Sequence, residues 1–235
     1  MRPGAAALYD YIYAYKDYEG DAQKIHLLLN EAGVGNGSDV LEAACGTARY
    51  LECLQPWFSV SGFDLDREML RQAAWRVPGG DFFQANMETF QPGRVWDALL
   101  CLFGGVGYLD PEEGLLRGLL AFHTALRPGG VLLVEPWVTP ERFEPGKAWM
   151  QTYTAPNFKL ARLVVPRLEG RQCVLEFHFQ VARGGGRVEQ LRSTERLWLH
   201  PLGLVVDCAR EIGFSVELTR QGFMADGHLL ICKRN

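Results

Sequence analysis

The feature that most constrains this chain is a regular alternation of strand-like and helix-like segments between residues 39 and 135. The strand-like segments are 39–43, 58–63, 82–85, 96–102 and 131–135. Residues 96–102 form a nearly continuous apolar run, which is typical of a strand covered on both faces. Strands that alternate with helices pair in parallel through right-handed crossovers. The sequence therefore predicts an α/β fold with a mostly parallel sheet.

The segments on either side of this region predict three further parts. Residues 5–32 have helical periodicity with a break near Gly20, and residues 202–212 are helical again before two short strands. Alternating character predicts antiparallel strands at 159–165, 172–182 and 187–199. We expect one domain, 1–235, with a helical cap (1–37), a ligand-binding core (38–137), an antiparallel insert (150–200) and a C-terminal helix and hairpin (201–235).

Composition argues against several kinds of partner. The chain has 235 residues, is 48% apolar, carries a net charge of -4 and has no basic run, so we expect no nucleic acid partner. No apolar run reaches about 18 residues, so we expect no membrane span. The six cysteines form no CxxC pair, which predicts reduced thiols in a cytoplasmic protein and no metal site.

The first strand leads into the small-residue turn Ala43-Ala44-Cys45-Gly46-Thr47-Ala48, and the second strand ends on Asp64. Small residues at a strand-to-helix turn let a ligand approach the backbone closely. A carboxylate at the tip of the next strand can accept hydrogen bonds from two ribose hydroxyls. These features predict a nucleoside-binding crevice, and by themselves they suit either a dinucleotide or S-adenosylmethionine (SAM).

The turn resembles the acidic-x-G-x-G-x-G loop of class I SAM-dependent methyltransferases, with Ala44 and Ala48 at two of the glycine positions. A dinucleotide site would space its glycines as GxGxxG, which this loop does not do. The resemblance implies a Rossmann-like class I methyltransferase fold with a seven-stranded sheet. It also implies SAM as cofactor and S-adenosylhomocysteine as product.

The resemblance extends through Gly62-Phe63-Asp64-Leu65-Asp66, Ala85-Asn86-Met87 and Arg127-Pro128-Gly129-Gly130. It implies that Asp64 holds the ribose, that Leu65 and Met69 pack the adenine, and that Asn86 and Met87 recognise its edge. We also expect two N-terminal tyrosines, Tyr13 and Tyr18, to contact the cofactor. The other expected cofactor contacts are Glu42, Ala44, Cys45, Gly46, Asp64, Leu65, Met69, Asn86, Met87, Leu102 and Phe103.

A finer resemblance connects the chain to bacterial nucleotide-linked aminosugar N-methyltransferases. It rests on Gly105-Val106-Gly107-Tyr108-Leu109, Val134-Glu135-Pro136-Trp137, Pro140-Glu141-Arg142-Phe143, Lys16-Asp17-Tyr18 and Glu176-Phe177-His178-Phe179. It implies a small-molecule acceptor, a nucleotide-linked deoxysugar amine, with Tyr108 and Trp137 beside it.

Methyl transfer from a sulfonium needs an acceptor held in line with the sulfur, and an amine acceptor must arrive neutral. The candidate bases are His178, which alternates with two phenylalanines, and His123, which lies within a predicted helix. An O- or C-methyltransferase and a non-catalytic SAM-binding protein remain the alternatives. The sequence leaves the oligomeric state open, with a homodimer as one outcome.

Overall fold

The computed structural model describes residues 6–111, 113–184, 186–220, 222–224 and 227–235. The chain divides into two compact units. The larger unit comprises Asp17–Glu141 and Leu199–Asn235, and the smaller unit comprises Met1–Lys16 and Arg142–Trp198. The expected helical cap is therefore divided between the two units.

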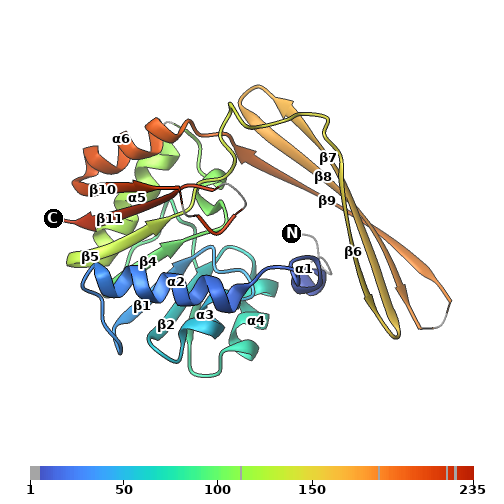
Figure 1. The fold of residues 1–235 in the computed structure, drawn as a ribbon, viewed down its shortest axis with the longest axis horizontal. Coiled ribbons are helices and arrows are strands. Elements are labelled where there is room, and N and C mark those ends of the chain that lie inside the picture. Colours follow the sequence, from blue (N-terminus) through green and yellow to red (C-terminus); the bar gives the residue numbers. More distant parts are fainter. Residues whose placement is uncertain (1–5, 112, 185, 221, 225–226) are drawn as a thin grey trace. The chain divides into compact units, whose positions relative to one another are not determined.

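The larger unit contains a seven-stranded sheet in the order β10-β11-β5-β4-β1-β2-β3 (Figure 1). Its strands are β1 (Asp39–Ala43), β2 (Ser59–Asp64), β3 (Asp81–Gln84), β4 (Trp96–Cys101), β5 (Leu126–Val134), β10 (Phe214–Thr219) and β11 (Leu229–Arg234). The first five strands pair in parallel, and β11 runs antiparallel to both β5 and β10. The predicted α/β class is confirmed, and so is the parallel pairing of the strands that alternate with helices.

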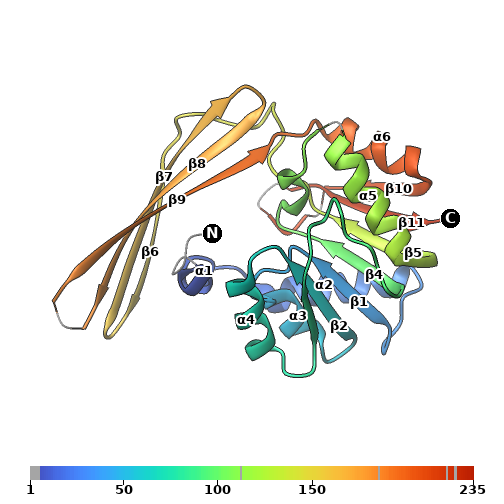
Figure 2. The ribbon, with the colours of Figure 1, turned by 180° about the vertical axis from the view of Figure 1, so that it is seen from behind.

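Helices cover both faces of this sheet, as Figures 1 and 2 show from opposite sides. They are α2 (Tyr18–Glu31), α3 (Arg49–Leu54), α4 (Arg67–Arg76), α5 (Glu113–Ala125) and α6 (Leu202–Ile212), with a short 3-10 helix η1 (Gly105–Tyr108) after β4. One buried cluster, including Phe63 and Phe122, packs beneath α5 and α6. The other, including Ile25 and Leu51, packs beneath α2, α3 and α4. Two cores on one sheet explain why β4 is apolar except for Asp97 near its start.

The smaller unit consists of helix α1 (Ala6–Ile12) and a four-stranded antiparallel sheet. Its strands, in spatial order, are β6 (Trp149–Ala155), β7 (Phe158–Glu169), β8 (Gln172–Arg183) and β9 (Val188–Trp198). The strands β7 to β9 were predicted, whereas β6 was not. Helix α1 packs on β6 and β7 through Tyr11, whose ring centroid lies 5.0 Å from that of Tyr153 and 4.7 Å from that of Phe158.

The break in the N-terminal helical segment lies at residues 13–17, so its expected position near Gly20 is wrong. Asp17 caps α2 by accepting a hydrogen bond from the Gly20 N–H at 2.9 Å. A Cβ at Gly20 would lie 2.3 Å from the Asp17 carboxylate. Glycine therefore leaves room for the capping carboxylate at this position and does not interrupt the helix.

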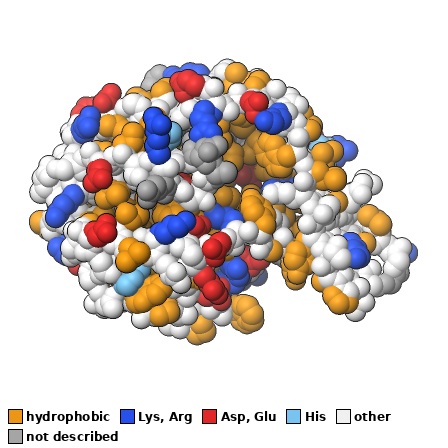
Figure 3. Space-filling view, viewed as in Figure 1, with side chains coloured by type: hydrophobic (Ala, Val, Ile, Leu, Met, Phe, Trp, Pro, Cys, Tyr) orange, Lys and Arg blue, Asp and Glu red, His pale blue; other side chains and the backbone are white. Residues whose placement is uncertain are grey.

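The surface carries charged side chains of both signs, as the composition indicates. Figure 3 shows acidic and basic side chains interspersed over the face that it draws. Among the described residues, no helix combines the length and the apolar character that crossing a membrane requires. The six cysteines are free thiols, and all but Cys53 are buried.

Candidate functional site

The small-residue turn closes over the carboxyl ends of β1 and β2. Glu42 in β1 lies opposite Gly62 in β2, and the Cys45 N–H then donates to the Phe63 carbonyl at 3.0 Å. A Cβ on Gly62 would lie 2.8 Å from the Cys45 sulfur, so the loop packs directly on that glycine. The turn therefore holds its backbone at the edge of the sheet.

Left-handed backbone conformations shape this turn. The φ angles of Ala44, Gly46 and Ala48 are 54°, 53° and 60°, and Ala48 is the residue that precedes α3. These are the three glycine positions of the resembled motif, so Ala44 and Ala48 adopt the conformation that glycine would adopt at lower cost. The substitutions keep the turn and add local strain.

Asp64 lies at the tip of β2, between two turns. One carboxylate oxygen accepts the Gly46 N–H at 2.9 Å, and the other accepts the Asp66 N–H at 2.9 Å. Burial raises the pKa of Asp64, and the N–H donors of Asp66 and Gly46 oppose that shift. A carboxylate has about four acceptor positions. Asp64 therefore retains capacity to accept hydrogen bonds from a diol.

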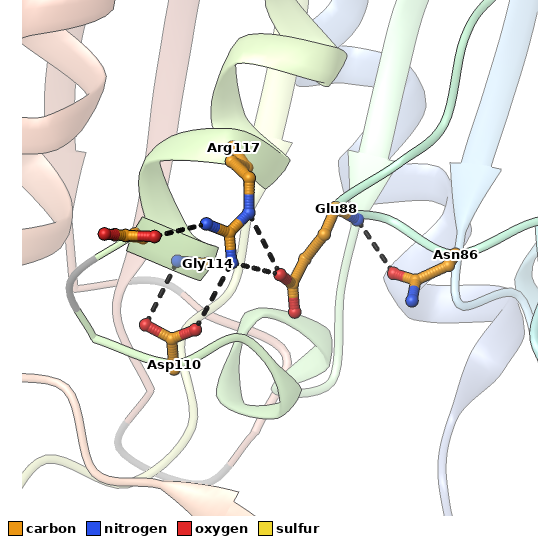
Figure 4. Close-up of polar contacts among 6 residues, drawn as sticks. Asn86, Glu88, Asp110, Gly114 and Arg117 are labelled. Carbon is orange, nitrogen blue, oxygen red and sulfur yellow. Dashed lines mark hydrogen bonds and ion pairs between the residues drawn. The ribbon is translucent and has the colours of Figure 1, made fainter.

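Asn86 follows β3 in a turn that α5 supports (Figure 4). Its side-chain oxygen accepts the Glu88 N–H at 2.9 Å. Glu88 in turn accepts a hydrogen bond from Arg117 of α5 at 2.7 Å. Arg117 also pairs with Glu113 at 2.8 Å and with Asp110 at 3.6 Å, and the hydrogen bonds that it donates to Glu88 and Glu113 raise its pKa. The network fixes the amide orientation of Asn86.

Beside this turn is a cavity of about 790 Å³, lined by Leu65, Ala85, Asn86 and the aromatic rings of Phe83, Phe90 and Trp96. Leu65 is 65% exposed, whereas Met69 on α4 is only 5% exposed. A planar apolar group at this edge would contact Leu65 directly and would meet little of Met69.

The carboxyl end of β4 forms the other side of the site. Leu102 is buried, and Phe103 and Gly104 both have positive φ, at 53° and 77°. Trp137 packs against this turn, because a Cβ on Gly104 would lie 2.8 Å from its ring. Tyr108 is 51% exposed at the end of η1.

Comparisons with known proteins distinguish between a dinucleotide and SAM as the ligand of this chain. A family profile described as a methyltransferase domain matches residues 40–130. The dTDP-3-amino-3,4,6-trideoxy-alpha-D-glucopyranose N,N-dimethyltransferase of Streptomyces venezuelae is 33% identical over 225 residues, covering 94% of this chain and 92% of the relative. The chain belongs to the family of bacterial aminosugar N-methyltransferases. It is a SAM-dependent methyltransferase.

Solved structures agree with this assignment. The crystal structure of DesVI from Streptomyces venezuelae matches with a TM-score of 0.91 at 30% identity, over 100% of both chains. SAM-bound CalS10, an amino pentose methyltransferase from Micromonospora echinaspora, matches with a TM-score of 0.86 at 26% identity, over 98% of this chain and 96% of that one. The predicted Rossmann-like methyltransferase fold with an antiparallel insert is confirmed.

The residues of this methyltransferase's larger unit fit SAM. Apart from Gly46 and its two chain neighbours, no heavy atom of the described residues lies within 4 Å of the position that a Cβ on Gly46 would take, so the backbone there can be approached closely. Asp64 offers acceptors for the ribose, and the Asn86 oxygen has a second lone pair after accepting from Glu88. These acceptors match the hydroxyl groups of a ribose and the amino group of an adenine, which donate hydrogen bonds.

The two tyrosines that were grouped with these cofactor contacts lie in different units. Tyr18, in the larger unit, is buried and packs edge-on against Tyr50 at 5.0 Å. Tyr13, in the smaller unit, accepts a hydrogen bond from Arg162 at 3.1 Å. Burial raises the pKa of Tyr13, and the Arg162 charge opposes that shift.

The structure does not bring His123 to the site. Helix α5 starts near the carboxyl end of β4 and ends where β5 begins, so its last turn lies at the opposite edge of the sheet. His123 packs edge-on against Phe214 at 4.9 Å, and Arg234 donates to its backbone carbonyl at 3.0 Å. Burial and the nearby Arg234 lower its pKa. The expectation that His123 acts as a base is therefore corrected.

His178 lies in the four-stranded sheet, on the face opposite the buried Phe177 and Phe179, as its alternation predicts. Its side chain is 43% exposed, and its Nε2 lies 3.3 Å from the Glu176 carboxylate. Its catalytic role stays a prediction.

Sequence reasoning assigned no role to two buried polar side chains near η1 and β5. The His200 ring is 2% exposed and its Nε2 lies 3.1 Å from the Val106 carbonyl, so it supports the turn that carries Tyr108. Glu135 is fully buried at the end of β5. The available signals were a histidine before Pro201 and an acidic residue ending an apolar strand.

Proposed function

We propose that this methyltransferase transfers methyl groups from SAM to the amino nitrogen of a nucleotide-linked deoxyaminosugar. The observation that carries the proposal is the 33% identity to an N,N-dimethyltransferase of such a sugar, because it extends over 94% of this chain. A match confined to the cofactor-binding core would support the reaction and leave the acceptor open. The amino pentose activity named for CalS10 supports the same acceptor chemistry, an amine on a sugar ring.

We assign the cofactor contacts to the carboxyl edge of the larger unit's sheet. Gly46 and its neighbours provide close backbone approach, Asp64 accepts from the ribose hydroxyls, and Asn86 accepts from the adenine amino group. Leu102 and Phe103 line the methionine end. SAM supplies an activated methyl group, so the protein's task is to align the acceptor nitrogen and to exclude water.

Tyr108 and Trp137 are the proposed acceptor contacts of the larger unit. Tyr108 has half of its surface exposed, and Trp137 packs on the same turn through Gly104. An amine attacks only as its neutral form. The assignment of Tyr13 and His178 as groups that orient or deprotonate the amine stays a prediction from the sequence.

The direct test incubates the full-length protein with SAM and a dTDP-linked aminodeoxysugar, with mass spectrometry of the nucleotide sugar. The expected products carry one and then two added methyl groups. A dTDP-sugar with a hydroxyl in place of the amine should remain unmodified. Methylation of the hydroxyl compound alone would contradict this proposal and would indicate an O-methyltransferase.

Asp64→Asn tests the cofactor assignment in the same preparation. Asn keeps the size of the side chain but removes the charge that favours hydrogen bonds from hydroxyls, so SAM should bind about tenfold or more weakly. The matched control is Asp207→Asn on the exposed face of α6, which should bind SAM as the unmodified chain does. Calorimetry measures both. Equal SAM affinity in the two variants would contradict the assignment of the ribose contact to Asp64.

A non-catalytic SAM-binding protein is the rival from another functional class. It predicts calorimetric binding of SAM with no methylated product from any amine tested. Absence of binding by the unmodified chain at high micromolar SAM would contradict both hypotheses.

We also propose that the protein is a cytoplasmic homodimer. Free thiols support a reducing compartment, and burial raises the pKa of Cys101 to about 12, which makes it unreactive. On one face of the four-stranded sheet, Met150, Leu163 and Val165 are 66%, 44% and 41% exposed, and this exposed apolar surface supports self-association.

A further inference from the structure

Glu135 occupies a place where two separate loops meet. It follows β5, and its side chain is fully buried. Its backbone N–H donates to the Cys101 carbonyl at 2.9 Å, and its carbonyl accepts the Gly104 N–H at 3.1 Å. These bonds place the carboxylate beside the turn that ends β4.

Three backbone N–H groups converge on this one carboxylate. One oxygen accepts the Phe103 N–H at 2.9 Å. The other oxygen accepts the N–H groups of Phe223 and Met224, the latter at 2.7 Å. Backbone N–H groups can only donate, so an anion that accepts on both oxygens matches this arrangement.

The turn that ends β4 depends on this support. Phe103 has a φ of 53°, a left-handed conformation that a phenylalanine rarely adopts without help from its surroundings. The Glu135 side chain accepts a hydrogen bond from the Phe103 N–H, and the Glu135 carbonyl accepts one from the Gly104 N–H. The same residue therefore satisfies both donors of the strained turn.

The C-terminal loop is shaped around the same carboxylate. A Cβ on Gly222 would lie 2.9 Å from the Glu135 oxygen, and a Cβ on Gly227 would lie 3.2 Å from it. The two glycines also join the loop ends, with the Gly222 N–H donating to the Gly227 carbonyl at 3.1 Å. Between them, Phe223 brings its ring to 6.2 Å from that of Tyr50.

We infer that Glu135 is a positioning residue that fixes the wall of the SAM site at its methionine end, acting through the backbone of Phe103 and of the 222–224 segment. The inference rests on the proposed assignment of Leu102 and Phe103 to the methionine portion of SAM. Asp64 and Asn86 lie on the other strands of the sheet edge, so the nucleoside end of the site does not depend on Glu135.

Glu135→Gln is the first test. A glutamine side chain has one accepting and one donating end, so its NH2 group would face either Phe103 or the 222–224 segment. We expect S-adenosylhomocysteine to bind about tenfold more weakly to the variant. We expect 5′-methylthioadenosine, which lacks the amino acid portion, to bind with less than about a twofold change. Calorimetry on the full chain measures both.

Gly222→Ala is the second test, because it keeps the carboxylate and displaces the loop. Its Cβ would lie 2.8 Å from the Gly227 backbone, so the segment must shift. The same ligand pattern is expected. Hydrogen exchange of the Phe103 and Met224 amides should be faster in both variants, while the amides of β1 stay protected.

Two results overturn the inference. One is an equal loss of both ligands, which indicates general destabilisation. The other is unchanged S-adenosylhomocysteine binding in Glu135→Gln with faster exchange at Phe103, which indicates that the turn does not line the methionine end. Failure of the unmodified chain to bind either ligand would instead contradict the proposed cofactor site itself.

Discussion

Three residues other than glycine have positive φ in the described part of the chain: Ala44, Ala48 and Phe103. All three lie in turns at the carboxyl edge of the larger unit's sheet. A left-handed L-residue costs roughly 1–2 kcal/mol. Strain of this kind concentrates at functional sites, where surrounding contacts hold it. At the residue scale, the three strained backbone positions and the Asp64 carboxylate therefore mark the same edge of the sheet.

Ala48→Gly should stabilise the protein by about 0.5–1 kcal/mol, because glycine adopts the left-handed conformation without a Cβ clash. The matched control is Ala73→Gly, which is equally buried but lies in the middle of α4. That variant should lose about 1 kcal/mol. Urea denaturation of both compares them directly. Destabilisation by the same amount in both would show that Ala48 is unstrained.

Individual site residues differed in how far the sequence could place them. Asp64 and Gly46 follow from spacing along two adjacent strands, and the structure joins them by a 2.9 Å hydrogen bond. His123 was misplaced because helical periodicity does not say at which edge of a sheet a helix ends. Glu135 received no role of its own because its donors come from residues up to 89 positions away.

At the scale of elements, strand ends are held by side chains as well as by the ladder. Asp97 of β4 accepts the Asp39 N–H of β1 at 2.8 Å and also pairs with Arg127 of β5. Burial raises the pKa of Asp97, but the hydrogen bonds from Arg127 and Asp39 outweigh it, so the pKa is lowered overall. One carboxylate thus joins three parallel strands.

Asp97→Asn should cost about 1 kcal/mol at neutral pH. A lowered carboxyl pKa stabilises the folded state above the unfolded pKa of about 3.9, and this stabilisation is lost as the pH falls through the folded value. The difference between the variant and the unmodified chain should therefore shrink below about pH 4. Urea denaturation across this range measures it. A difference that is constant with pH would contradict an ionic contribution.

Element boundaries were least predictable where burial gives no pattern. Strand β6 alternates between exposed and half-buried residues and contains no buried residue, so its sequence lacks an apolar alternation. The strand expected at 131–135 begins earlier, because residues 127–130 lie inside β5, where the register with β4 shifts. Both features depend on pairing with a distant strand, which local sequence does not encode.

At the scale of the whole molecule, the smaller unit's sheet makes the homodimer testable. Leu163 and Leu168 both lie on β7, with 44% and 49% exposure, but on opposite faces. If the face with Met150 and Leu163 is the interface, Leu163→Glu should yield monomers, while Leu168→Glu should remain dimeric. Sedimentation velocity at matched concentrations measures this. A monomeric unmodified chain, or dimers in both variants, would contradict the assignment.

Local patterns in the sequence were sufficient to predict the α/β class, the parallel pairing, the small-residue turn after β1 and the place of Asp64 at the tip of β2. These depend on local periodicity and on the rule that parallel strands end at one edge of a sheet. Three other features are found only in the folded chain: the left-handed conformations of Ala44 and Ala48, the placement of Tyr13 and Tyr18 in different units, and the hydrogen bonds that Glu135 accepts from two loops. Such features arise from contacts between distant segments, where the geometry of one segment sets what its neighbour requires.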